Sequence, residues 1–85
     1  MAKNDEIGEV IHYYTHLGVA VIKLSSEMKK GDMIEIKGHV TDFSQSVNSM
    51  QFDHKSVDVA KSGESIGLKV DDHVREGDKV YKVAE

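Results

Sequence analysis

The sequence predicts an all-β fold, a small closed antiparallel β-barrel of six or seven strands. A turn-and-strand phrase occurs twice, as KKGDMIEIKG at 29–38 and REGDKVYKVA at 75–84. In each phrase Gly supplies the positive φ of a chain reversal and Asp can hydrogen-bond the turn backbone. Apolar and polar residues then alternate, as they do along a strand. Similar short segments recur along the chain, and closing them into a barrel removes exposed sheet edges.

Seven strands are expected, with turn signals among them. The turn signals are the glycine-containing stretches at 16–18, 30–32, 62–64 and 76–78. Short strands at regular spacing between such turns are typical of antiparallel domains. The expected strands are Ile7–Tyr14, Ala20–Leu24, Met33–Gly38, Asp42–Asp53, Val57–Ala60, Ser65–Val70 and Lys79–Val83.

The first of these segments also fits a helix. Its apolar residues Ile7, Val10, Ile11 and Tyr14 follow the i, i+3, i+4, i+7 spacing. However, Gly8 lies inside the segment, and the run VIHYYT is rich in residues that prefer strands. A strand is therefore the favoured interpretation.

The fourth segment, 42–53, changes the parity of its apolar positions. Phe43 and Val47 are odd, whereas Met50 and Phe52 are even. One extra residue near Asn48 would bring both groups to the inner face, so we predict a β-bulge at 48–49 within one long strand.

The composition indicates one domain covering residues 1–85, with a core at about 6–84. There is no proline, no linker and no low-complexity tract. The absence of cysteine excludes disulfides, a thiol nucleophile and thiolate metal sites. No apolar run is long enough for a signal peptide or a membrane span. A soluble, cytoplasmic protein without membrane association is expected.

The net charge of −4 argues against tight nucleic-acid binding. Acids and bases are interspersed, and Arg75 is the only arginine. Nucleic-acid binders usually gather positive charge on one face and favour Arg for phosphate contacts. We therefore expect no DNA binding and at most weak RNA binding, through lysines that the fold would have to bring together: Lys23, Lys29, Lys37, Lys69 and Lys82.

The order of four sequence segments resembles that of known protein families. The segments IGEVIHYYTHLGVAVIKLSSEMKKGDMIEIKG, SVNSMQF, DVAKSGESIGLKV and VREGDKVYKV together resemble the second domain of the translational GTPases, of which elongation factor Tu is the best-known member. The pattern is also similar to the barrel at the C-terminal end of the U32 peptidase-like family, whose members modify RNA or cofactors. Both resemblances imply a β-barrel.

The departures from the GTPase family limit what the resemblance implies. No Gly-x4-Gly-Lys-Ser/Thr phosphate-binding loop occurs, so there is no GTPase domain. In elongation factor Tu a glutamate and an asparagine of this barrel contact the end of tRNA. The matching positions here are Ser49 and Ser65, which cannot reproduce those contacts.

No residue set points to catalysis, a cofactor or a metal. His12 and His16 would lie roughly 13 Å apart on a strand, too far for one ion. His39, His54 and His73 lie near expected turns, and the favoured interpretation is that their side chains are exposed to solvent. The serines lack a Gly-x-Ser-x-Gly elbow. The chain is therefore expected not to be an enzyme.

Weak binding candidates lie around the expected bend. Gln45, Ser49 and Gln51 are polar residues near the predicted bulge, and uncharged hydrogen-bonding groups there suit specific contacts. Ser65 and Lys69 complete the candidate set. Tyr13 and Tyr14 must face opposite sides of a strand, and the exposed one can anchor a partner or stack on a base.

Three functions remain open at this stage. The favoured one is a stand-alone, non-enzymatic binding module that associates with a ribosome, a translation factor or another ribonucleoprotein, chiefly through protein contacts. The alternative is a detached accessory, substrate-binding barrel of a U32 peptidase-like RNA- or cofactor-modifying enzyme. The third is a homo-oligomer that pairs through an exposed strand edge.

Overall fold

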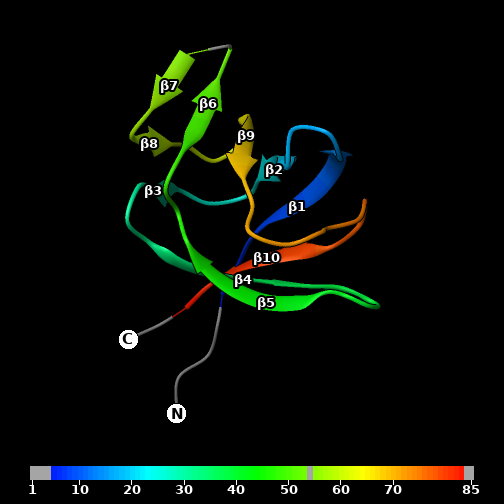
Figure 1. The fold of residues 1–85 in the computed structure, drawn as a ribbon. Coiled ribbons are helices and arrows are strands. Elements are labelled where there is room, and N and C mark those ends of the chain that lie inside the picture. Colours follow the sequence, from blue (N-terminus) through cyan, green and yellow to red (C-terminus); the bar gives the residue numbers. More distant parts are fainter. Residues whose placement is uncertain (1–4, 54, 84–85) are drawn as a thin grey trace.

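The fold is entirely β in the part of the chain that the structure describes. This computed structural model describes residues 5–53 and 55–83, which contain no helix. The strands are β1 (Asp5–Tyr14), β2 (Val19–Leu24), β3 (Met28–Lys29), β4 (Met33–Lys37), β5 (Asp42–Ser46), β6 (Met50–Phe52), β7 (Lys55–Val57), β8 (Val59–Ala60), β9 (Ser65–Lys69) and β10 (Lys79–Lys82). The prediction of an all-β barrel-like fold is confirmed (Figure 1).

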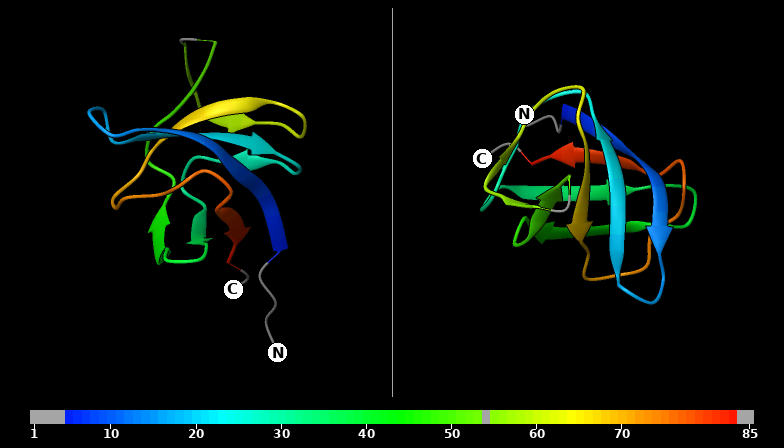
Figure 2. Two further views of the ribbon diagram at one scale, coloured as in Figure 1. Left: turned by 90° about the vertical axis from the view of Figure 1, so that its right-hand side faces the viewer. Right: turned by 90° about the horizontal axis from the view of Figure 1, so that it is seen from above.

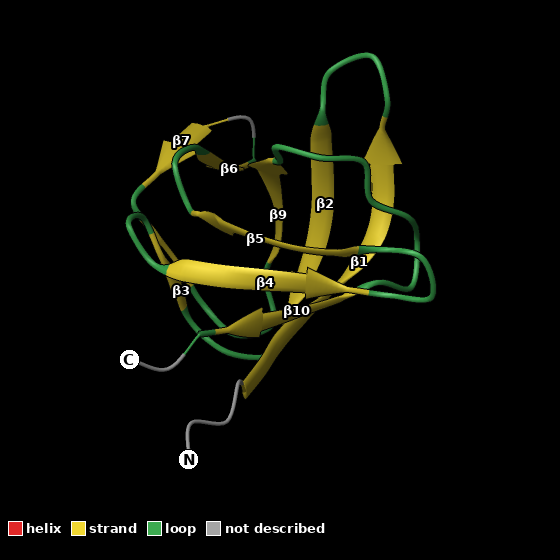
Figure 3. Cartoon of the chain, turned by 60° about the horizontal axis from the view of Figure 1, so that its bottom comes forward, coloured by secondary structure: helices red, strands yellow, loops and turns green. Residues whose placement is uncertain are grey.

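Eight of the strands form one curled antiparallel sheet. Their order is β5-β4-β10-β1-β2-β9-β6-β7, and β3 pairs separately with β8. Seen from above, β1, β2 and β9 run crosswise to β4, β5 and β10 (Figure 2, right). Figure 3 shows the same strands wrapped around a common interior. The sheet is thus bent into a half-barrel whose concave side holds the core.

The core is made of the inward-facing residues of nearly every strand. Along β2 the burial alternates, with Ala20, Ile22 and Leu24 buried. The same alternation on β4 buries Ile34 and Ile36. This is the period-two pattern expected of a sheet with one face against the core.

The number of strands is higher than the six or seven predicted. The expected strand 42–53 is divided into β5 and β6, and the expected strand 57–60 is divided into β7 and β8. The two-residue strand β3 was not predicted, because Met28 and Lys29 are too few for an alternation to be visible.

The predicted bulge at 48–49 is wrong. Strand β5, which pairs with β4, ends at Ser46, and the chain then continues into β6, which pairs with β9 and β7. Val47 and Met50 are both buried, so the parity change is real. It reflects a change of neighbouring strand, and Phe52, which we expected inside, is 38% exposed.

The first segment is a strand, as predicted, and it carries the sheet's register irregularities. One lies between Glu6 and Gly8 against β10, and another lies between Val10 and His12 against β2. A Cβ at Gly8 would lie only 2.7 Å from Ile22 Cγ2 and 3.0 Å from the carbonyl oxygen of Lys23. Gly8 therefore permits a close approach of β1 and β2 that any other residue would disturb.

Three turns share one design. In each, a glycine with positive φ precedes an acidic residue, whose backbone N–H donates to the carbonyl of the residue three positions earlier. The acidic side chain in turn accepts the backbone N–H of that same earlier residue, at 2.8–3.0 Å. A positive φ at the third position is that of a type II turn, which favours Gly. The turns are 29–32, 61–64 and 75–78.

Each of these turns also binds one buried residue from elsewhere in the chain through both backbone groups of that residue. The turn glycine donates its N–H to the carbonyl of the buried residue, and the acidic residue's carbonyl accepts the N–H of the buried residue, at 2.8–2.9 Å. Turn 29–32 holds Val47, turn 61–64 holds Leu24 and turn 75–78 holds Val10. All three residues are at most 2% exposed, so the turns supply partners that water cannot.

Gly77→Ala should test the geometry of these turns. Gly77 has φ of 93°, which strains any residue with a Cβ by about 1–2 kcal/mol. We expect a loss of unfolding free energy of that size in urea denaturation. Ser62→Ala, at an exposed position of turn 61–64, is the matched control and should change stability by less than about 0.5 kcal/mol. Equal stability of the two variants would contradict this account.

Lys79 should contribute stability that depends on pH. A hydrogen bond from Lys79 Nζ to Glu9 Oε1 at 3.1 Å raises the pKa of Lys79 above its ordinary value of 10.5; desolvation opposes the shift and Glu6 reinforces it. A raised pKa contributes stability that is fully present below pH 10.5 and is lost as the pH rises through the raised value.

The corresponding measurement compares the parent protein with Lys79→Gln across this pH range. The difference in unfolding free energy between them should be constant near neutral pH and should shrink above pH 10.5. Added salt should reduce it as well, because the ion pair is partly exposed. A difference that does not change at high pH would show that Lys79 acts through packing alone.

Candidate functional site

The outer face of strands β2, β9 and β6 carries a small hollow. In the sheet register Val19 is opposite Lys69, and Gln51 is opposite Gly67. Alternation along β9 places Leu68 in the core and leaves Gly67 and Lys69 on the outer face. The hollow has a volume of about 210 Å³, and we call it the Gly67 hollow. It is lined by Val19, Ser49, Gln51, Gly67 and Lys69.

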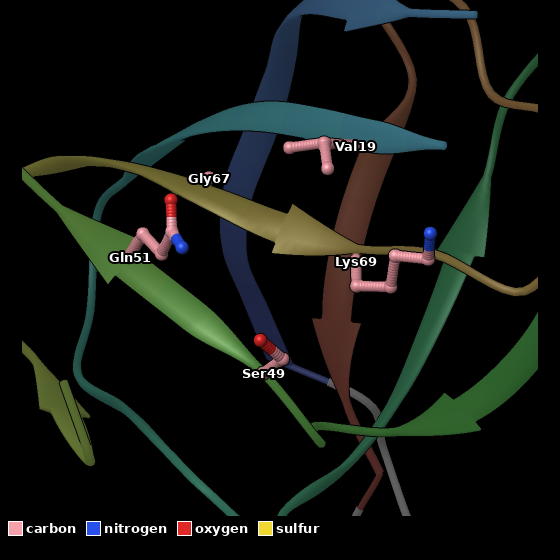
Figure 4. A pocket seen from close by; sticks show the side chains of 5 residues that line it. All are labelled: Val19, Ser49, Gln51, Gly67 and Lys69. Carbon is pink, nitrogen blue, oxygen red and sulfur yellow. The ribbon is translucent and has the colours of Figure 1, made fainter. Parts of the chain in front are cut away.

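Because Gly67 has no side chain, its backbone forms the floor of this hollow. Figure 4 shows Gly67 on β9 between Val19 of β2 and Gln51 of β6, with Lys69 at the end of β9. A Cβ at Gly67 would touch Val19 Cγ1 at 3.4 Å, which is ordinary contact. A small side chain is therefore tolerated sterically at this position, but a larger one would fill the hollow.

A second, larger hollow continues from the first. It has a volume of about 390 Å³ and shares Val19, Gln51 and Gly67 with the Gly67 hollow. Its other lining residues are Tyr14, Leu17, Val21, Asp53, Ser65 and Ile66. We call it the Tyr14 hollow. Tyr14 and Leu17 are 47% and 60% exposed, so this end of the surface is chiefly apolar.

Lys69 is held at three points. Its backbone N–H donates to the carbonyl of Ser49 at 3.2 Å, and its carbonyl accepts from the Gln45 side-chain amide at 2.9 Å. Its Nζ donates to the carbonyl of Leu17 at 2.9 Å. Both the backbone and the tip of this side chain are thus positioned before any ligand binds.

Gln45 lies behind the hollow and does not line it. The residue is 4% exposed. Besides contacting Lys69, its Oε1 accepts the backbone N–H of Asp71 at 2.7 Å. These contacts connect β5 to the chain that leaves β9, two segments that no ladder joins in the described sheet. Gln45 therefore positions Lys69 through the backbone.

The structure brings four of the five candidate residues to one surface. Ser49, Gln51 and Lys69 line the Gly67 hollow, and Ser65 lines the Tyr14 hollow. Their role in binding stays a prediction. Val19 and Gly67 were missed, although a glycine at an outward position of a strand is a signal of a close approach or an open surface.

Tyr14 lines the second hollow, and two histidines contact the aromatic residues of β1. Tyr13 packs against the core and Tyr14 is exposed, as the alternation predicted. His12 and Glu76 approach to 3.3 Å, and His73 packs edge-on against Tyr13. His54 lies outside the described residues. Among those that are described, no group of three or more His, Asp or Glu side chains could hold a metal ion.

No helix long and apolar enough to cross a membrane occurs among the residues that the structure describes.

The fold matches a solved domain almost completely. The C-terminal domain of a putative U32 peptidase from Geobacillus thermoleovorans superimposes with a TM-score of 0.87, covering 92% of this chain and 99% of that domain. A second structure of the same domain gives a TM-score of 0.86. Sequence identity is 20% in both cases, so these matches establish the fold alone.

Curated proteins provide closer sequence relatives. An uncharacterized protease of Methanocaldococcus jannaschii is 46% identical over 81 residues, which are 94% of this chain and 20% of that protein. A collagenase of Porphyromonas gingivalis is 35% identical over 78 residues, 89% of this chain and 22% of that protein. The chain thus spans about a fifth of the length of these relatives. No family model matches it.

These matches support one of the two resemblances seen in the sequence. The chain has the barrel fold of the C-terminal domain of a U32 peptidase, as the second resemblance implied. The resemblance to the second domain of translational GTPases is not supported by them.

Replacing Gln45 should reveal how strongly the hollow depends on it. Gln45→Leu removes the partner of the Lys69 carbonyl and of the Asp71 N–H, both in partly buried hydrogen bonds, at a cost of roughly 1–3 kcal/mol of unfolding free energy. The exposed Gln51→Leu is the matched control and should cost less than about 0.5 kcal/mol. Urea denaturation measures both, and a Gln45→Leu variant as stable as the control would refute the bridging role.

Proposed function

We propose that this chain is a non-catalytic binding barrel that acts together with a U32 peptidase-like catalytic unit and helps to hold its substrate. The observation that carries the proposal is the near-complete match to the C-terminal domain of a putative U32 peptidase. Two curated relatives, one named an uncharacterized protease and one a collagenase, support it, because the chain corresponds to only about a fifth of each. The remaining length of such proteins is where we place the catalytic unit.

The residues of the barrel favour binding over chemistry. The chain has no cysteine, and the described part contains no cluster of metal-ligating side chains. What it does offer is a pair of adjoining hollows with one cation, several neutral polar groups and apolar walls. Ligand sites commonly combine an apolar lining with a few polar groups in this way.

The arrangement of the strands leaves the hollows accessible. Asp5 pairs with Lys82, so the first and last described strands lie side by side. In Figure 1 this pairing lies in the lower part of the molecule, whereas β6 and β9 are in the upper part. A connection or a contact near the paired β1 and β10 would therefore leave the Gly67 hollow free for substrate.

Affinity capture tests this function. The tagged chain, purified from its host's lysate with and without ribonuclease, should recover a larger U32 peptidase-like protein that carries the cysteines this chain lacks. Recovery should be insensitive to ribonuclease. Capture of ribosomal proteins alone would overturn the proposal and would favour the association with the translation machinery that the sequence first suggested.

Reconstitution provides the second test. Adding the barrel to the captured catalytic protein should lower the KM for its substrate, with a smaller effect on kcat, because a holding domain contributes mainly to binding. Gly67→Leu, which fills the hollow, should remove this effect, whereas the exposed Val59→Ala on β8 should retain it. If the parent and Gly67→Leu lower the KM equally, the substrate does not bind in the Gly67 hollow.

A further inference from the structure

We propose that the Gly67 hollow binds a small anionic group, a carboxylate or a phosphate, that is attached to an apolar moiety lying over Gly67. The inference rests on the proposed substrate-holding role and names the chemistry of what is held. Three features support it: an available cation, neutral donors that line the same hollow, and an open floor at Gly67 that continues into apolar walls.

The cation is Lys69. In the part of the chain that the structure describes, the basic members of the ion pairs are Lys37, Lys79, Lys82 and His12, and Lys69 is not among them. An ammonium group has three N–H donors, and one of them is used by the carbonyl of Leu17. Two donors and the full positive charge therefore remain for a ligand.

The position of this cation is established in advance. The carbonyl of Lys69 accepts from the buried Gln45, its N–H donates to Ser49, and its tip is tied to Leu17. A long lysine side chain normally loses considerable rotamer entropy when it is immobilised. Here much of that loss has already occurred on folding, which favours binding.

The other polar side chains that line the Gly67 hollow are neutral. The Ser49 hydroxyl and the Gln51 amide line the same hollow, and no carboxylate lines it. Both groups can donate to an anionic oxygen. The adjoining Tyr14 hollow is lined by one carboxylate, that of Asp53. An anion is thus attracted to the Lys69 end, and a cation has no partner there.

The floor and walls of the hollow determine which kind of group should be attached to the bound anion. Gly67 presents bare backbone between Val19 and Gln51 (Figure 4). The surface then continues into the apolar walls of Tyr14, Leu17 and Val21. A ligand whose apolar part covers Gly67 and extends toward Tyr14 removes apolar surface from water, at roughly 25 cal/mol per Å². An inorganic anion alone gains none of this.

Amide NMR titration of the intact chain tests the proposal. The probes are phenyl phosphate, phenylbutyrate and the uncharged phenylbutanol. We expect the two anions to shift the amide resonances of Ser49, Gln51, Gly67 and Lys69 saturably, and to bind on the order of tenfold more tightly than the alcohol. The stronger of the two anions identifies the headgroup as phosphate or carboxylate.

Matched lysine variants distinguish a specific site from general surface charge. Lys69→Gln should weaken binding of the better anion on the order of tenfold. Lys23→Gln removes an exposed lysine from the neighbouring strand β2 and should leave binding unchanged. Gly67→Leu should weaken binding with Lys69 still present. The dispersion of each variant's spectrum reports whether it remains folded, and Lys69→Gln decides the question if Gly67→Leu does not fold.

Several outcomes would overturn the proposal. They are equal affinity of the parent and Lys69→Gln, equal affinity for phenylbutanol and the anions, and resonance shifts confined to other strands. If these occur while the barrel still lowers the KM of its catalytic partner, only the ligand class is wrong. If no catalytic partner is captured but the anions bind at Lys69, the proposed function fails and the anion site stands.

Discussion

The barrel depends on three buried residues whose backbone N–H and carbonyl groups form their hydrogen bonds with turns. Val10, Leu24 and Val47 each donate a backbone N–H to a glycine turn and accept a backbone N–H from the same turn. An unpaired backbone group in such a position would cost free energy comparable to a lost hydrogen bond. Because the acidic side chain of each turn also accepts a backbone N–H, the turns are rigid enough to serve as anchors. They fix where the sheet bends.

Turn 29–32 also determines the path of the chain toward the candidate site. Turn 29–32 binds Val47 between β5, which pairs with β4, and β6, which pairs with β9. Gln45, two residues earlier, bridges to Lys69 and Asp71. The same polar contacts that connect the two sides of the half-barrel therefore set the position of Lys69. The stability of the fold and the geometry of the hollow are coupled at this crossover.

Local patterns account for most of what could be predicted. Alternation along β2, β4 and β9 identified the strands and their inward faces, since side-chain direction along a strand depends only on parity. Gly and an acidic residue identified the turns, because a positive φ requires a special residue. The prediction of one bulged strand over 42–53 was wrong for a physical reason. A parity change is satisfied equally by a bulge or by a change of partner strand, and only the position of turn 29–32 distinguishes them.

The sequence by itself determined that the chain is all-β, where it turns, and which polar residues near Met50 are candidates for binding. Only the tertiary structure decided that Ser49, Gln51 and Lys69 share one hollow with Val19, and that Gln45 lies behind it. The reason is that strand pairing is a long-range property. Val19 and Lys69 are opposite each other across β2 and β9, and no local pattern reports a register between segments so far apart in the chain.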